Sequence, residues 1–245
     1  MYQFQPKQSK FKQLMSGPYV MYLFLAIQVI IFALMELSGV LKGTFSGSTS
    51  SATLYKFGAM YPVAVTDLHH FWRFVTPIFV HIGFVHFGVN SLTLYFCGRI
   101  LEPLIGHWRF FVLYLMSGIL GNLLSFAFAN PVSLSAGAST SIFGMFAAFL
   151  ILGRMYPNQP LINQMYQNMK LLIIMNLVLN LFDSSVDIWG HLGGAIGGVI
   201  MMLLLDVPKR YKAAQTEMNP HFRILAGIVL VFMIVFCLFY GFGKA

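Results

Sequence analysis

Long apolar runs constrain this chain more than any other feature of its sequence. A helix needs about 20 apolar residues to cross the ~30 Å hydrocarbon core of a bilayer. Apolar runs occur at residues 19–37, 81–100, 108–128, 138–153, 170–182, 188–205 and 224–242, and most of them approach that length. The 245-residue chain is 58% hydrophobic and only 9% charged, whereas soluble domains carry about 25% charged residues. The sequence therefore predicts an all-α integral membrane protein.

The basic residues indicate how such a protein is oriented. The net charge of +8 would suit a nucleic-acid partner, but the charges stand in the short connections between apolar runs, as membrane topology produces. A cytoplasmic N-terminus places most of them inside: Lys7, Lys10, Lys12, Arg99, Arg109, Arg154, Lys170, Lys209, Arg210, Lys212 and Arg223. Lys42, Lys56, Arg73 and Lys244 then lie outside. The charges thus predict a multi-pass cell-membrane protein with its C-terminus outside and no nucleic-acid partner. The short loops favour a bacterial membrane.

Two segments do not fit a simple span. Residues 38–80 begin with Ser, Thr and Gly and continue with many aromatic residues. Structureless loops of this length are uncommon, and aromatic side chains favour the membrane interface. We therefore expect a partly membrane-embedded loop here. The run at 170–182 follows a polar stretch, 154–169, and is short for the bilayer core, which predicts local thinning or a water-exposed end.

A serine-rich stretch stands directly before an apolar run. Residues 133–144 crowd small polar residues around Gly137, Ser139 and Thr140, and the run from Met145 follows at once. Such a pattern is typical of a helix N-terminus, where Ser and Thr cap free N–H groups and the dipole favours negative charge. Backbone donors at this position can stabilise a serine oxyanion. Ser139 is therefore the candidate nucleophile, although a simple helix cap has the same pattern.

His191 is the candidate base for this serine. It lies in an apolar run beside glycines repeated every four positions, a pattern that lets neighbouring membrane helices approach closely. If the helix that begins near Ser139 packs there, the two side chains come within hydrogen-bonding reach, as an activated serine requires. Asp187, one turn before His191, is the nearest carboxylate. We expect it at the interface and favour a Ser–His dyad over a full triad.

His86 and Asn90 form the third polar group within an apolar run. They are four residues apart and so share one face of their helix. Both can donate hydrogen bonds to a developing oxyanion. The alternative is a polar clamp between helices. His81, His86 and His191 do not supply a metal site, because these helices hold neither a His-Glu-x-x-His pair nor a carboxylate. We therefore predict no metal and no cofactor.

These motifs together resemble the rhomboid family of intramembrane serine proteases. The resemblance rests on Gly137-Ala138-Ser139, on His191 with the glycine pairs after it, and on His86-x-x-x-Asn90. Supporting similarities are Trp72-Arg73, His81 and the stretch from Gly98 to Glu102. It covers about residues 55–205. It implies a basic cytoplasmic tail at 1–17, a six-helix catalytic core at 18–206 with the embedded loop 38–80, and a basic linker with a seventh transmembrane helix at 207–245.

The resemblance also implies a mechanism and a class of substrate. His191 would take the proton of Ser139, which would attack a peptide bond in or beside a transmembrane segment of a membrane-protein substrate within the lipid bilayer. His86, Asn90 and the backbone N–H of Ser139 would hold the oxyanion. One position departs from the family pattern: Thr140 follows the serine where the family commonly has Gly, which would restrict the backbone or narrow the cleft.

Two other functions stay open from the residues. A non-proteolytic rhomboid-like protein would bind membrane helices without cleaving them. A transporter would use the same polar residues for solute, although the sequence has neither internal repeats nor paired buried charges. Arg99 and Glu102 are expected to be structural, either pairing or fixing the turn into the next helix. The oligomeric state and the natural substrate are not predicted.

Overall fold

The computed structural model describes residues 17–41, 43–44, 46–180, 186–205 and 220–244. Its long helices are α2 (Tyr19–Val40), α5 (Gly83–Ile105), α6 (His107–Phe128), α7 (Ser139–Met155), α8 (Pro160–Asn180), α9 (Ile188–Leu204) and α10 (Pro220–Gly243). Helices α2, α6 and α10 are each long and apolar enough to cross a membrane, and α7 and α9 are shorter apolar helices. The protein is therefore an all-helical multi-pass membrane protein over the described residues. The six-plus-one arrangement in the bilayer stays a prediction.

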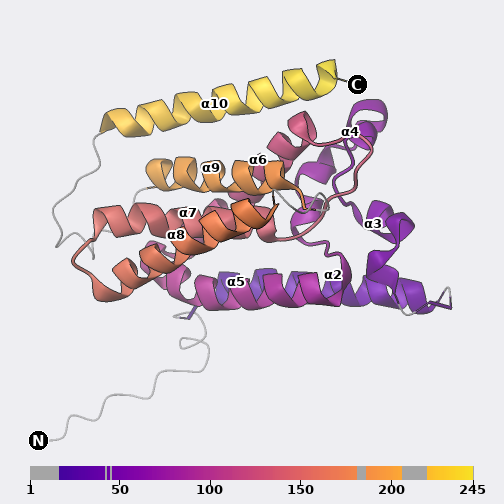
Figure 1. Ribbon diagram of the computed structural model, residues 1–245, viewed down its shortest axis with the longest axis horizontal. Helices are drawn as coiled ribbons and strands as arrows, with labels where there is room; N and C mark the ends of the chain where they lie inside the picture. The colour runs from indigo at the N-terminus through magenta and orange to yellow at the C-terminus, as the bar shows by residue number, and fades with distance from the viewer. Residues whose placement is uncertain (1–16, 42, 45, 181–185, 206–219, 245) are drawn as a thin grey trace, which may run out of the picture.

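The helices pack around α6, α7 and α9. Helix α6 makes its most extensive contacts with α9, and both pack against α7. Helices α2 and α5 run side by side along one edge of the molecule, and α10 lies along the opposite edge next to α9 (Figure 1). Close approach is possible because glycines face neighbouring backbone. A β-carbon at Gly194 would lie 2.0 Å from the Thr140 carbonyl oxygen, and one at Gly198 would lie 2.3 Å from that of Gly144.

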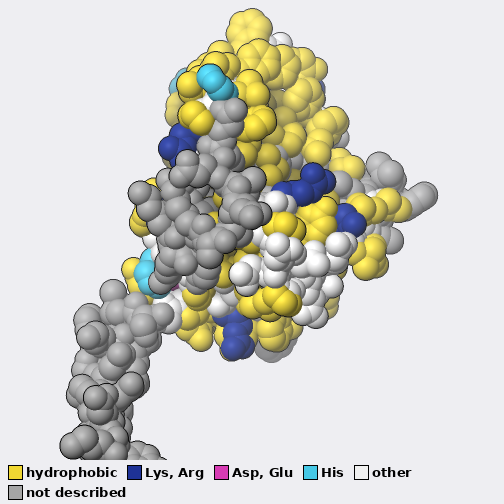
Figure 2. Space-filling view, turned by 90° about the vertical axis from the view of Figure 1, so that its left-hand side faces the viewer, with side chains coloured by type: hydrophobic (Ala, Val, Ile, Leu, Met, Phe, Trp, Pro, Cys, Tyr) yellow, Lys and Arg dark blue, Asp and Glu magenta, His cyan; other side chains and the backbone are white. Residues whose placement is uncertain are grey.

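One end of the bundle is marked by basic residues. The C-terminus of α7, which carries Arg154 in its last turn, and the N-termini of α8 and α10 lie at the left of Figure 1. Figure 2 views this end and shows several Lys and Arg side chains among hydrophobic ones. Residues 1–16 and 206–219, which include the predicted basic tail and most of the basic linker, lie outside the described residues.

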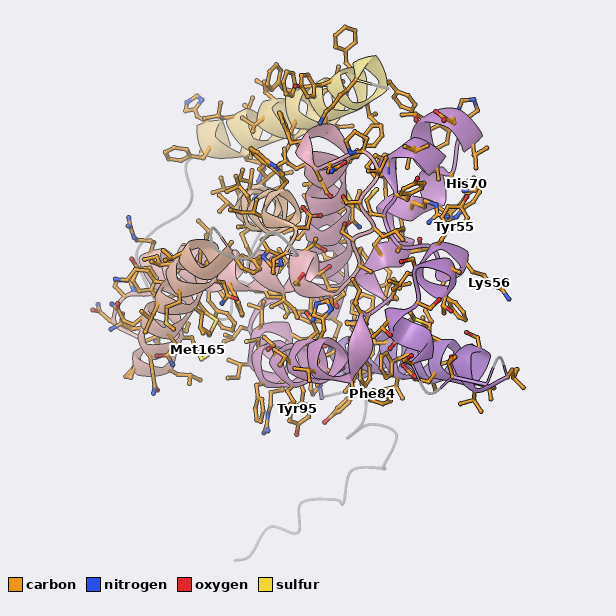
Figure 3. All side chains as sticks on the ribbon, turned by 45° about the vertical axis from the view of Figure 1, so that its right-hand side comes forward. Tyr55, Lys56, His70, Phe84, Tyr95 and Met165 are labelled. Carbon is orange, nitrogen blue, oxygen red and sulfur yellow. The ribbon has the colours of Figure 1, made fainter. Side chains whose placement is uncertain are left out.

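The segment predicted as an embedded loop, 38–80, is more ordered than its composition suggested. It contains α3 (Ser51–Phe57), α4 (Pro62–Leu68) and three 3₁₀ turns, η1 (Gly47–Thr49), η2 (Phe71–Phe74) and η3 (Thr76–Ile78). Arg73 is buried at its centre, donates hydrogen bonds to the carbonyls of Ala59 and Tyr55, and stacks 4.3 Å above the Tyr55 ring. Tyr55 and His70 lie together at this part of the molecule (Figure 3). One buried cation therefore ties α3 to η2.

The boundary prediction for the fifth helix was wrong. The polar stretch 154–169 was expected to be a connection, but α8 begins at Pro160 and is 21 residues long. Proline suits the first turn of a helix, where its missing N–H is not needed. Polar side chains on this first part of α8 are exposed, so they do not oppose helix formation. The last helix likewise begins earlier than predicted, at Pro220. Of the predicted tight connection at 183–187, residues 183–185 lie outside the described residues.

Buried polar groups connect the helices at two depths. Glu102 is fully buried and accepts hydrogen bonds from the backbone N–H groups of Val20 and Met21 at the start of α2. Its carboxylate also lies 2.6 Å from His107 Nδ1 at the start of α6. The expected structural role of Glu102 in the turn into the next helix is thus confirmed. Nearer the middle, Gln28 Nε2 donates to the Tyr114 hydroxyl at 2.7 Å.

Candidate active site

The four predicted site residues line one cavity. It has a volume of about 620 Å³ and lies between α5, α7, α8 and the start of α9. Its walls include the following residues: Ile82, His86, Val89, Asn90, Thr93, Asn122, Leu134, Ser135, Ala136, Gly137, Ser139, Thr140, Ile142, Phe143, Phe146, Leu172, Asn176, Val186, Asp187 and His191. The structure therefore brings together Ser139, His191, His86 and Asn90 from three helices that are distant in sequence. Their roles stay predictions at this point.

Ser139 is the first residue of α7, and its position is set by the loop before it. The predicted helix N-terminus is confirmed, but Ala138 stands at the cap position and no side-chain hydrogen bond caps the helix, which argues against the alternative of a simple serine cap. The Ala138 N–H donates to His81 Nε2 at 3.3 Å, and the Gly137 N–H donates to the Pro77 carbonyl at 2.9 Å. The loop before α7 is thereby tied to the segment before α5. As the first helical residue, Ser139 has a backbone N–H outside the helical ladder.

Gly137 lies beside both Ser139 and His86, and its conformation and surroundings require a glycine. Its φ of +143° disfavours an L side chain, and a β-carbon there would lie 2.5 Å from His86 Cε1 and 2.8 Å from His86 Nε2. The same β-carbon would lie 3.6 Å from Ser139 Oγ. The His86 ring and the Ser139 hydroxyl thus both face the backbone of Gly137. A larger residue at this position would displace the imidazole.

The hydrogen bonds of His86 leave one ring nitrogen directed at the cavity. The Ile82 N–H donates to Nδ1 of His86 at 3.4 Å. A neutral imidazole with an acceptor at Nδ1 carries its proton on Nε2, the atom that faces Gly137. Asn90 Nδ2 donates to the His86 carbonyl at 2.9 Å, one helical turn back. The contact at Nδ1 leaves His86 Nε2 available as a donor, whereas one of the Asn90 donor protons is used within α5.

His191 lies one turn into α9 and is 8% exposed. Its ring stacks on that of Phe143 from α7, with centroids 4.3 Å apart and planes 13° apart. Phe143 is one turn beyond Ser139, so the same helix that carries the serine also supports the histidine ring. The glycines around His191 pack against α6 and α7, which keeps the imidazole close to the start of α7.

Thr140 turns out to be a packing residue between three helices. A β-carbon at Gly121 of α6 would lie 2.8 Å from Thr140 Cβ, and one at Gly190 of α9 would lie 3.2 Å from Thr140 Cγ2. The threonine side chain therefore occupies the space that these two glycines leave. Thr140 also contributes to the cavity wall but is only 6% exposed. The predicted effect of Thr140 on the backbone or the cleft stays a prediction.

Sequence reasoning missed three contributors to this site. Asn122 is buried, lines the cavity and donates to the Phe74 carbonyl at 2.9 Å. Phe143 supports His191, and Asn176 brings α8 to the cavity wall. Asn122 carried a usable signal, because an amide within a membrane-spanning run is costly unless it has a partner. Phe143 carried none, since a phenylalanine in an apolar helix is ordinary.

The fold and the cavity define a class: a helical multi-pass membrane protein with a serine and a histidine in one cavity. Comparison with known proteins identifies the family, since residues 68–207 match the family model described as the Rhomboid domain. The chain belongs to the rhomboid family.

Several relatives in this family are named as proteases. The chain is 35% identical over 224 residues to "Rhomboid protease GluP" of Bacillus subtilis (strain 168), covering 91% of this chain and 41% of that protein. It is 36% identical over 135 residues to "Rhomboid-type serine protease 2" of Emericella nidulans, covering 54% of this chain and 26% of that protein. It is 33% identical over 174 residues to "RHOMBOID-like protein 1" of Arabidopsis thaliana, covering 70% of this chain and 44% of that protein. The chain thus spans less than half the length of these relatives.

Proposed function

We propose that this chain is an intramembrane serine endopeptidase of the rhomboid type that uses a Ser139–His191 dyad. The observation that carries the proposal is the shared cavity, because residues from α5, α7 and α9 supply it with a hydroxyl, an imidazole and oxyanion donors. Family membership supports the same reaction class, since one relative is named a rhomboid protease and another a rhomboid-type serine protease.

The reaction would proceed by acyl transfer. His191 accepts the Ser139 proton as the serine oxygen attacks the substrate carbonyl carbon, and the same proton then passes to the leaving amine. His86 Nε2, the remaining donor capacity of Asn90 and the Ser139 backbone N–H stabilise the tetrahedral oxyanion. Water, deprotonated by His191, hydrolyses the acyl-enzyme and regenerates Ser139.

The substrate would be a membrane protein cleaved within or beside a transmembrane helix. A helical peptide bond is shielded by its own hydrogen bonds, so the segment must unwind to enter the cavity. Small or helix-destabilising residues near the cleaved bond would lower that cost. The basic side chains at the end of the bundle with the α7 C-terminus support a cytoplasmic position for that end. Ser139, at the opposite end of α7, would then face the outside of a bacterial cell membrane, on the same side as the C-terminus.

A fluorophosphonate probe tests the nucleophile without knowledge of the natural substrate. The detergent-solubilised wild type should be labelled, whereas Ser139→Ala and His191→Ala should not. Ser141→Ala is the matched control, because Ser141 lies in the same helix, is fully buried and has a hydroxyl without a hydrogen-bond partner. Labelling that persists in Ser139→Ala would overturn the assignment.

Cleavage of a model transmembrane segment in liposomes then distinguishes a protease from a protein that only binds membrane helices. The protease loses turnover in Ser139→Ala and retains binding of the segment. A folded wild type that binds the segment but is neither labelled nor able to cleave it would support the non-proteolytic alternative.

A further inference from the structure

The carboxylate of Asp187 is held between two helices at the wall of the cavity. One oxygen accepts the Gly190 backbone N–H at 2.9 Å, which caps the first turn of α9. The other oxygen accepts the Ser125 hydroxyl of α6. The carbonyl of Asp187 also accepts the His191 N–H at 3.2 Å. Both carboxylate oxygens are thus engaged by groups that determine where α9 begins.

Helix α6 is a suitable anchor for this contact. It packs against both α7 and α9, and Asn122, one turn before Ser125, joins it to η2 through the Phe74 carbonyl. A β-carbon at Gly193 would lie 2.9 Å from the Leu120 carbonyl of α6, so α9 rests directly on the α6 backbone. A bond from Ser125 to the cap of α9 therefore fixes the rotation and depth of α9 relative to a helix that also contacts α7.

We propose that Asp187 is a positioning residue for the histidine base: through Ser125 and Gly190 it sets His191 against Ser139. The inference rests on the proposed dyad and deepens it. The negative charge at the α9 N-terminus is favourable in itself, but the tether to Ser125 is what links the cap to α6. Small displacements matter here, because a misplacement of about 1 Å at reacting groups can lower a rate about 100-fold.

Substitutions at Asp187 separate this role from that of a triad carboxylate. Asparagine can accept from Gly190 with its oxygen and donate to the Ser125 hydroxyl with its amide, so it rebuilds the tether without the charge. A triad aspartate changed to asparagine loses about 10⁴-fold in kcat. For a positioning residue we expect Asp187→Asn to keep kcat within roughly tenfold of wild type, and Asp187→Ala to lose up to about 100-fold with KM little changed.

Ser125→Ala tests the other end of the tether. We expect kcat to fall about tenfold, and the double variant Ser125→Ala/Asp187→Ala to be little worse than Asp187→Ala, because the two side chains act as one unit. Ser117→Ala is the matched control, since Ser117 is buried in the same helix and its hydroxyl has no hydrogen-bond partner. Wild-type kcat in both Ser125→Ala and Asp187→Ala would overturn the proposal, as would a 10⁴-fold loss in Asp187→Asn.

Hydrogen exchange of the full chain in detergent tests the tether without a measurement of catalytic activity. Amides of the first turn of α9, Gly190 and His191 included, should exchange faster in Asp187→Ala and Ser125→Ala and near the wild-type rate in Asp187→Asn. The exchange rates test the tether even if the wild type shows no Ser139-dependent labelling. Absence of that labelling would refute the proposed function but not the tether. If Asp187→Ala does not fold, Ser125→Ala decides: unchanged exchange and unchanged kcat in that variant would refute the tether.

Discussion

Substituting Gly194 with alanine should separate α7 and α9, the helices that carry Ser139 and His191. A β-carbon at Gly194 would lie 2.0 Å from the Thr140 carbonyl oxygen and 2.8 Å from its carbonyl carbon. These atoms are backbone, so no side-chain rotation can relieve the contact, and α7 and α9 must move apart by roughly 1 Å. Overpacking of this kind costs about 1–3 kcal/mol, against which alanine contributes at most ~1 kcal/mol of helix propensity. We expect Gly194→Ala to lower both the melting temperature and the rate of fluorophosphonate labelling, the rate by about 100-fold.

The matched control for Gly194→Ala is Gly88→Ala in α5. Gly88 is also a helical glycine, but a β-carbon there would meet no atom within 4 Å. This variant should keep the wild-type labelling rate and match or exceed its melting temperature, because only the propensity gain applies. Both rates are measured in the same detergent, with the labelled fraction followed over time on a gel. Equal labelling rates for Gly194→Ala and wild type would refute the idea that the α7–α9 contact sets the geometry of the dyad.

Three further substitutions follow from buried contacts. Arg73→Ala removes the cation that binds the carbonyls of Tyr55 and Ala59, and we expect it to destabilise the protein by about 2–4 kcal/mol and lower its melting temperature. Glu102→Ala leaves two backbone N–H groups of α2 without their acceptor and should cost about 1–3 kcal/mol, whereas Glu102→Gln retains an acceptor and should cost less. Thr140→Gly opens a void between three helices and should destabilise by roughly 1–2 kcal/mol rather than raise activity.

Each of these outcomes has a measurement that can contradict it. For Arg73→Ala, the comparison is with Lys56→Ala on an exposed face of α3, and equal melting temperatures would show that the buried cation contributes nothing measurable. For Glu102, the melting temperatures of the two variants are compared. A glutamine variant as unstable as the alanine variant would show that the charge, not hydrogen bonding, is required. For Thr140, faster cleavage in Thr140→Gly would show that the threonine obstructs the cavity.

The helices were predictable because membrane crossing demands long apolar runs. The predicted starts of the helices at Trp108, Ala138 and Ile188 lie within a residue of His107, Ser139 and Ile188 in the structure. The first part of α8 was missed because a helix outside the hydrocarbon core needs no apolar run, so its polar residues resembled a connection. The short helices of 38–80 were missed for a similar reason. Arg73 binds the end of α3 through the Tyr55 and Ala59 carbonyls, and such a contact partner is not visible in local composition.

The candidate site was predictable only as a set of residues. Ser139, His191 and His86 stood out because polar groups in apolar runs are costly, and the shared cavity agrees with their expected convergence. Their catalytic roles stay predictions. The contacts that hold these residues in place were not predictable from the sequence. Gly137 lies beside both Ser139 and His86, Phe143 stacks on His191, and Asp187 accepts a hydrogen bond from Ser125. Such contacts depend on helix rotation, which a pattern of apolar residues leaves open.

The connection between the loop before α7 and the segment before α5 bears on the order of folding. Met60 and Ser135 exchange both backbone hydrogen bonds, and Gly137 donates to the Pro77 carbonyl. Contacts between residues so far apart in sequence close late, because the intervening chain must first be ordered. During synthesis, the segment around Met60 is made well before Ser135, and His191 is made later still. Ser139 therefore reaches its place in the cavity beside His191 only after α9 has been made, so a chain that stalls before α9 lacks the complete site of the proposed protease.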